Sequence, residues 1–174
     1  MAVIDNLQSL ADSGDSVELT LPDGFIELDS SSVAVLAELH AAVSVGMSNV
    51  NLDDLSEIQR DAVPEGSVLL SIMLKAEEQS IHHLGGKAKV TVPVGDLTNG
   101  VDVFYLDDNG HMEKIDEVTC SDGKVTFCTT HFSYFVIVEG QTSDEQMFPL
   151  SIAIIVVAAI FGLMGAIYLY KKRE

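Results

Sequence analysis

The stretch EVTCSDGKVTFCTTHFSYFVIVEG, residues 117–140, decides the fold of the second half of the chain. Polar and apolar residues alternate on either side of Asp122-Gly123, a dipeptide typical of a two-residue β-hairpin turn. The run SYFVIVE at residues 133–139 is rich in β-branched and aromatic residues, as buried strands are. We therefore predict a hairpin that is followed by a buried closing strand.

Three stretches closer to the N-terminus show the same strand pattern. They are the long apolar run SVLLSIMLKA (67–76), the alternating run GGKAKVTVPV (85–94) and the run VDVFYLDDNGHMEKID (101–116). The last is predicted to be a hairpin turning at Asn109-Gly110, where both positions favour a positive φ. The second half of the chain is therefore expected to consist of antiparallel strands.

A weak internal repeat precedes these strands. FIELDSSSVAVLAELH (25–40) and NVNLDDLSEIQRDAV (49–63) share an apolar-x-Leu-Asp core at an offset of 24 residues. In each copy, Asp or Ser stands at a helix N-cap position and apolar residues follow at helical spacing. The strand-like runs SVELTLP (16–22) and AVSVGMS (42–48) precede the two copies. We predict a duplicated strand–strand–helix unit, with chance similarity of the copies as the alternative.

These patterns predict an α+β protein in which duplicated strand–strand–helix units precede a β-sandwich-like antiparallel region and a single C-terminal transmembrane helix. The expected division in chain order is a linker or frayed N-terminus (1–15), an α+β repeat region (16–84), a β-sandwich-like module (85–140), a juxtamembrane linker (141–147), a transmembrane helix (148–170) and a cytoplasmic tail (171–174).

The transmembrane prediction rests on FPLSIAIIVVAAIFGLMGAIYLY, residues 148–170, which carries no charge over 23 residues. A helix of about 20 residues crosses a bilayer core. Because KKRE follows and SDEQ precedes, the positive-inside rule places the C-terminus in the cytoplasm and the acidic body outside. Small residues recur at about four-residue spacing in this stretch, namely Ala158, Gly162, Gly165 and Ala166. This spacing suggests a face for helix packing in the membrane. The alternative is that they have no such role, because small residues are common in membrane helices.

Charge restricts the classes of partner. The chain has 9 basic and 27 acidic residues and a net charge of -18, and without residues 171–174 the net charge is -20. Such a surface repels phosphate backbones, so nucleic acid is not an expected partner. The expected partners are the lipid bilayer and sister modules or other surface proteins. MAVIDNLQSLADSGDS (1–16) lacks the features of an export signal. We therefore expect this sequence to be the C-terminal part of a longer exported protein, with removal of the signal as the other explanation. A tail-anchored, cytosol-facing interaction domain is the alternative.

The C-terminal half also resembles a known class of proteins. The pattern GKVTF-x-T-x-HFS-x-(Y/F)-x-(I/V) is carried here by residues 123–137. It is similar to the closing motif of membrane-anchored modules in cell-surface proteins, S-layer-like or adhesin-like, of Gram-positive bacteria and archaea. The resemblance extends over residues 17–170 and is specific over residues 86–138. It implies a non-catalytic structural or adhesion module, in a multi-module exported protein, that sits at the membrane.

His131-Phe132-Ser133 suggests a second hypothesis. The same tripeptide is the cleavage site of certain self-cleaving β-sandwich domains associated with death domains and of a nucleoporin domain. In that chemistry the Ser133 hydroxyl would attack the Phe132 carbonyl carbon while His131 takes its proton, and water would then hydrolyse the ester. The alternative is structural: His131 would bond a backbone carbonyl where the strand changes direction, and Ser133 would satisfy a local backbone amide. We favour the structural role and expect no enzyme, because G-x-S-x-G, H-E-x-x-H and P-loop motifs are absent from the sequence.

The sequence has two cysteines, Cys120 and Cys128. They could form a disulfide or remain as two buried thiols. A hairpin that turns at Asp122-Gly123 would place Cys120 opposite Val125, about 10 Å from Cys128, which disfavours a bridge.

Neither a metal ion nor another cofactor is expected. His82 and His83 are adjacent, so in a strand their side chains point apart and cannot easily share an ion. The run 107–110, DDNG, is similar to the start of a calcium loop but lacks the later bidentate acid, and an ordinary hairpin explains it.

Overall fold

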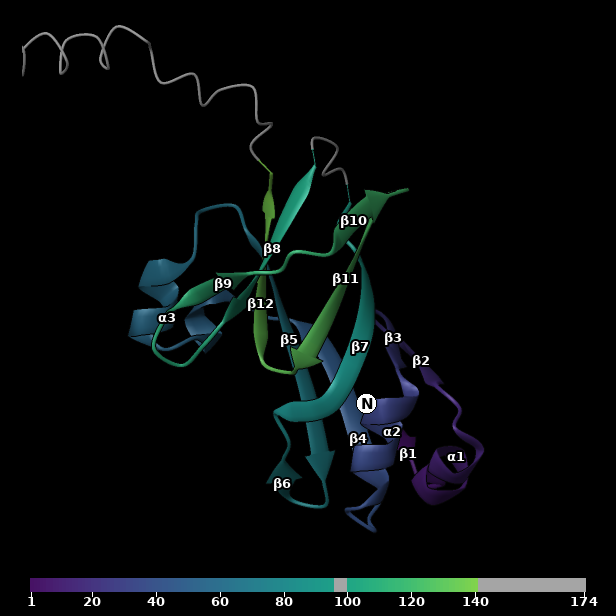
Figure 1. The fold of residues 1–174 in the computed structure, drawn as a ribbon. Helices are drawn as coiled ribbons and strands as arrows, with labels where there is room; N and C mark the ends of the chain where they lie inside the picture. The colour runs from purple at the N-terminus through teal and green to yellow at the C-terminus, as the bar shows by residue number, and fades with distance from the viewer. Residues whose placement is uncertain (96–99, 141–174) are drawn as a thin grey trace, which may run out of the picture. The chain divides into compact units, whose positions relative to one another are not determined.

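The computed structural model describes residues 1–95 and 100–140. Over these residues the chain is an α+β protein built mainly from antiparallel β-sheet, as predicted (Figure 1). Residues Met1–Gly140 form one compact unit. The expected boundary between residues 84 and 85 falls inside a strand, and both sheets contain strands from either side of that boundary.

The first sheet has the order β1-β4-β5-β12-β8-β9, and the short strand β6 pairs with β5. Its strands are β1 (Ala2–Ile4), β4 (Val43–Asn49), β5 (Val68–Ala76), β6 (Gln79–Ser80), β8 (Val101–Leu106), β9 (Met112–Lys114) and β12 (Tyr134–Glu139). The predicted closing strand is therefore an inner strand, with antiparallel partners on both sides.

The second sheet has the order β10-β11-β7-β3-β2. Its strands are β2 (Val17–Leu21), β3 (Gly24–Leu28), β7 (His83–Pro93), β10 (Val118–Ser121) and β11 (Lys124–His131). The predicted hairpin at Asp122-Gly123 is confirmed, because Ser121 pairs with Lys124 and both turn residues have positive φ.

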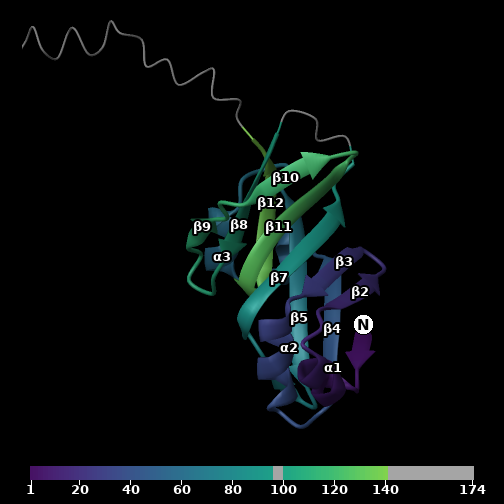
Figure 2. The ribbon, with the colours of Figure 1, turned by 45° about the vertical axis from the view of Figure 1, so that its right-hand side comes forward.

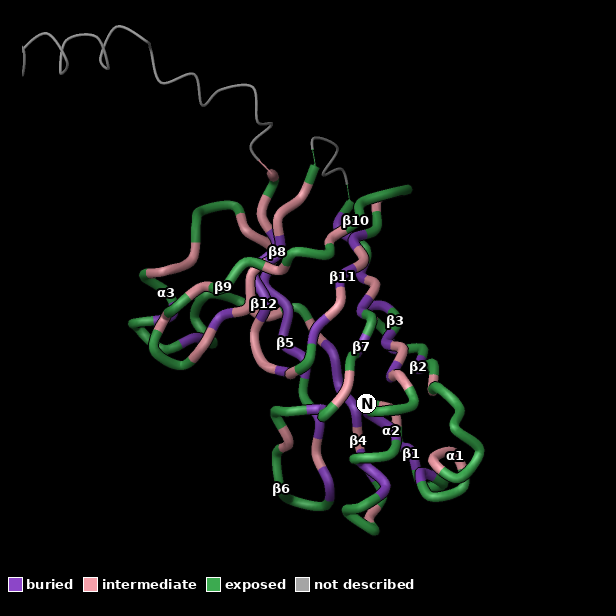
Figure 3. The backbone as a smooth tube through the Cα atoms, viewed as in Figure 1, coloured by how far each residue is buried: buried purple, intermediate pink, exposed green. Residues whose placement is uncertain are grey.

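The two sheets share one hydrophobic core. Figure 2 shows the second sheet lying in front of the first, and Figure 3 shows buried residues along strands of both sheets. The rings of Phe127 on β11 and Phe135 on β12 lie 5.0 Å apart and join the two layers. Gly24 on β3 allows a close approach, since a methyl group there would collide with the Thr91 carbonyl and with Met47 on β4. Inward-facing side chains alternate with outward-facing ones along most strands, which is the periodicity that sandwich packing requires.

Helices close the core at two places. The helices α1 (Leu7–Ser13) and α2 (Ser30–Ala37) contact each other, and α2 also packs on β7. Val33 and Leu36 of α2 are buried in the shared core. The 3₁₀ helix η1 (Leu52–Asp54) and α3 (Glu57–Ala62) lie beside the first sheet, where Leu55 contributes to a separate small core with Leu69, Leu106 and Val136.

The structure corrects two expectations about the first half. Residues 1–15 are not a frayed linker, because they form β1 and α1, in which Ile4 and Leu7 are buried. The first copy of the repeat is strand–strand–helix (β2, β3, α2), but the second copy is not: β4 leads into η1. The Asn51 N–H donates to the Asp54 carboxylate at 3.0 Å there, and η1 begins where a second strand was expected.

The turn between β8 and β9 also differs from its prediction. Gly110 has a positive φ of 76°, but Asn109 does not. Asp107 shapes the turn instead, because its carboxylate accepts hydrogen bonds from the backbone N–H groups of Asn109 (2.9 Å) and His111 (2.8 Å). These bonds, that of His111 foremost, lower the pKa of Asp107 against the opposing effect of burial.

The predictions for residues 141–147, 148–170 and 171–174 lie outside the described residues, and so do Ala158, Gly162, Gly165 and Ala166. Within the described residues, no helix has both the length and the apolar character needed to cross a bilayer.

Candidate functional site at the bend between β11 and β12

The tripeptide His131-Phe132-Ser133 forms the connection by which the chain passes from the second sheet to the first. β11 ends at His131 after an irregularity in its pairing with β7 between Thr129 and His131. Phe132 is 1 % exposed and belongs to the shared core. The bend is therefore fixed by the burial of Phe132 between strands that belong to different sheets.

Backbone hydrogen bonds hold this bend on both sides. The Phe132 N–H donates to the His82 carbonyl (2.8 Å), and the Ile72 N–H donates to the Ser133 carbonyl (2.9 Å). The Thr129 hydroxyl donates to the His131 carbonyl at 2.8 Å. All three contacts satisfy main-chain groups at a place where the regular ladder is interrupted.

The side chains of the tripeptide have partners other than those that the sequence suggested. Nδ1 of His82 lies 3.3 Å from the Phe132 carbonyl oxygen. The Ser133 side chain is hydrogen-bonded to Tyr105. Nδ1 of His131 lies 2.9 Å from the Thr130 hydroxyl oxygen. His82 is thus the imidazole beside the Phe132 backbone carbonyl. The structural hypothesis predicts His131 in such a role.

Burial sets the electrostatics of the site. Desolvation lowers the pKa of His131, His83 lowers it further and Glu113 opposes both, so the ring is mainly uncharged at neutral pH. Burial raises the pKa of Tyr105, with Asp107 and Asp108 adding to the rise and the bond from Ser133 opposing it. The Tyr105 hydroxyl therefore keeps its proton at neutral pH.

His82 and His83 face different neighbours, as expected for adjacent strand residues. His82 contacts Phe132, whereas His83 pairs in register with His131 and the two rings lie 5.8 Å apart. Tyr105 packs edge-on against His131 with 4.3 Å between ring centroids. The sequence named all three histidines but could not supply the pairing that brings two of them together.

A small cavity of about 170 Å³ lies beside the bend and is lined partly by His82, Phe132 and Ser133, with Ile72 and Met73 of β5. In the described part of the chain, no three or more His, Cys, Asp or Glu side chains form a group that could hold a metal ion.

The cysteine geometry agrees with the register expected from the hairpin. Cys120 pairs with Val125 and Cys128 pairs with Lys89, and the two cysteines are not joined to each other. The expectation of two buried thiols is wrong, because Cys120 is exposed and Cys128 half-buried. The cause is the strand period: Phe127 and Thr129 point into the core, so Cys128 between them points outward.

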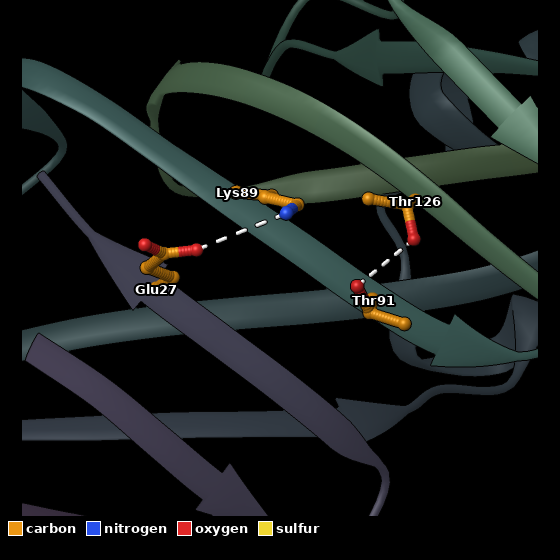
Figure 4. Close-up of polar contacts among 4 residues, drawn as sticks. All are labelled: Glu27, Lys89, Thr91 and Thr126. Atoms are coloured by element: carbon orange, nitrogen blue, oxygen red, sulfur yellow. Dashed lines mark hydrogen bonds and ion pairs between the residues drawn. The ribbon is translucent and has the colours of Figure 1, made fainter.

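The outer face of the second sheet is polar. An ion pair joins Glu27 on β3 to Lys89 on β7 at 3.9 Å, and the hydroxyls of Thr91 and Thr126 lie 2.9 Å apart (Figure 4). Because these pairs are exposed or half-buried, they contribute little to stability and mark a solvated face.

Comparison with family models, curated proteins and solved structures found no match for this chain.

Proposed function

We propose that the chain is a non-catalytic structural or adhesion module of a cell surface, held at the membrane by residues 148–170. The observation that carries this proposal is the position of β12. This strand lies between β5 and β8, inside the first sheet, and ends at Glu139. Eight residues separate it from the uncharged stretch of 23 residues. An anchor at that place would be covalently continuous with an inner strand of the module.

Charge and sequence order support the same proposal. The body of the protein is strongly acidic, and KKR directly follows the uncharged stretch. On the positive-inside rule, the C-terminus would be cytoplasmic and residues 1–140 would lie outside. The lipid bilayer would then be one partner, with sister modules or other surface proteins as further partners.

The proposal is tested by the side of the membrane on which each end lies. In a chain whose Cys120 and Cys128 are replaced by serine, one cysteine is introduced at Glu78, in the exposed turn between β5 and β6, or at Glu174. A membrane-impermeant maleimide should label Glu78→Cys on intact cells of the native host and Glu174→Cys only after lysis. The reverse pattern would identify a tail-anchored, cytosol-facing domain. Labelling of neither cysteine before lysis, together with recovery in the soluble fraction, would exclude an anchor.

Self-cleavage between Phe132 and Ser133 is the second candidate function. The observation that favours it is the contact of His82 Nδ1 with the Phe132 carbonyl oxygen, because a donor there would polarise the bond that Ser133 would attack. The uncharged His131 ring has the form that a proton acceptor needs. Against it, the Ser133 side chain is bonded to Tyr105.

Intact mass measured under denaturing conditions decides between the two functions at this bend. A structural module gives one full-length species for the wild type and for Ser133→Ala. A self-cleaving module gives two fragments that divide after Phe132 in the wild type, and one species in Ser133→Ala. The matched control is Ser71→Ala, which changes a buried serine on the neighbouring strand β5 and should not alter the mass pattern.

A further inference from the structure

The facing histidines of β7 and β11 are a feature that the proposed function leaves unused. His83 is the first residue of β7, His131 is the last residue of β11, and the two pair directly across the strands. Their ring centroids are 5.8 Å apart. Two imidazoles that share one metal ion through nitrogen–metal bonds of about 2.1 Å have centroids about 5 to 6 Å apart. The observed spacing therefore falls in the range that a shared ion requires.

The surroundings of His131 supply the support that metal-binding histidines usually have. A ligating imidazole commonly donates its second N–H to a neighbouring oxygen, which fixes the ring and its tautomer. The Thr130 hydroxyl lies 2.9 Å from Nδ1 of His131. An Nδ1–H that donates to this hydroxyl leaves the lone pair of Nε2 for an ion.

The space beside His131 could admit a partly hydrated cation. An open cavity of about 320 Å³ reaches His131 and has both acidic and basic residues in its lining, namely Glu113, Asp116, Glu117, Lys87 and Lys114. Lys114 is already paired with Asp102 at 2.8 Å. Water could complete the coordination from this open side.

We propose that His83 and His131 form a two-imidazole site for one divalent transition metal ion of the Zn²⁺, Ni²⁺ or Cu²⁺ class. Imidazole nitrogen is a preferred ligand for these ions, whereas Ca²⁺ and Mg²⁺ prefer oxygen. The bound ion joins the start of β7 to the end of β11, next to the bend at Phe132. It acts as a clip at the place where the ladder between these strands is irregular.

Titration calorimetry of the full chain in detergent, with ZnCl₂ and NiCl₂ as separate probes, tests the site. We expect one ion per chain for each metal, and at least about tenfold weaker binding in His83→Gln and in His131→Gln. His83 is exposed, so His83→Gln should keep the wild-type unfolding temperature in the presence of EDTA. This variant tests the site without disturbing the core.

The chain provides its own matched controls. His40, His82 and His111 are exposed histidines outside the pair, and their Gln variants should bind as the wild type does. Paramagnetic Ni²⁺ should broaden amide resonances at both residue 83 and residue 131. Equal binding by the wild type and His83→Gln would overturn the proposal. So would a loss in His82→Gln as large as that in His83→Gln, or broadening confined to one of the two strands.

Discussion

Asp29 joins the start of α2 to the strand β7 through Lys87. One oxygen of its carboxylate accepts the Lys87 backbone N–H at 2.9 Å, and the other accepts the Ser32 N–H at 2.7 Å. The Asp29 N–H in turn donates to the Lys87 carbonyl at 3.0 Å. One side chain therefore caps a helix and secures it to the central strand of the second sheet.

Replacing Asp29 by alanine should destabilise the fold by about 1–2 kcal/mol, because a helix cap of this kind contributes about that amount. The free energy of unfolding, measured by urea titration of the full chain in detergent, checks this value. Glu38→Ala is the control, since it removes an exposed carboxylate at the other end of the same helix and should change stability by less than about 0.5 kcal/mol. Equal effects of the two variants would contradict the role given to Asp29.

The same residue predicts a pH dependence. Burial alone would raise the pKa of Asp29, but the N–H groups of Ser32 and Lys87 outweigh it and lower the pKa. A carboxyl whose folded-state pKa is depressed stabilises the fold above its unfolded pKa of about 3.9 and loses that contribution as the pH falls through the folded value. The stability difference between the wild type and Asp29→Asn should be constant from pH 7 to 5 and shrink below pH 4. A difference that grows toward acid would contradict this sign.

Gly86→Ala should be destabilising by about 1–3 kcal/mol, the range typical of overpacking. A methyl group at Gly86 would collide with the Asp29 carboxylate and with the backbone nitrogen and hydroxyl of Ser32. Gly46→Ala is the matched control in strand β4, because the nearest atom there is the Met1 side chain at 3.2 Å and neither glycine has a positive φ. Thermal unfolding should give a lower unfolding temperature for Gly86→Ala than for Gly46→Ala. Equal unfolding temperatures would show that α2 can shift away from residue 86 at little cost in stability.

Phe132→Ala should destabilise the fold by about 3–5 kcal/mol, because it opens a cavity in the shared core. Phe25→Ala is the control, since Phe25 is 40 % exposed on the outer face of the second sheet. Urea titration of both variants gives the comparison, with a difference of at least about 2 kcal/mol expected. A smaller difference in the free energy of unfolding would mean that neighbouring residues move into the cavity left by the Phe132 ring.

Local signals in the sequence were sufficient for much of the fold. Asp122-Gly123 predicts the position of the hairpin turn because both residues adopt a positive φ. Asp29 predicts the start of α2 because its side chain caps that helix. Long-range pairing was not accessible in this way. β1 has only three residues and depends on β4, some forty positions later, for its partner, so the first residues read as a linker.

The same difference between local signals and long-range contacts applies to the candidate site. His131, Phe132 and Ser133 were identified from their tripeptide, whereas the contact of His82 with Phe132 joins residues fifty positions apart. Ser133 and His131 are close in the sequence, which suggests that their side chains interact. In the structure the Ser133 side chain instead interacts with Tyr105, because β8 and β12 are neighbours in the first sheet.

The inner position of β12 has a mechanical consequence. Tension applied at Gly140 along this strand acts perpendicular to the hydrogen bonds that join it to β5 and β8. Those bonds are then loaded together, in shear, on both flanks at once. An edge strand pulled away from its neighbour would instead lose its bonds one after another. A chain tethered at this end would therefore resist a pull along β12 better than a chain tethered through an edge strand.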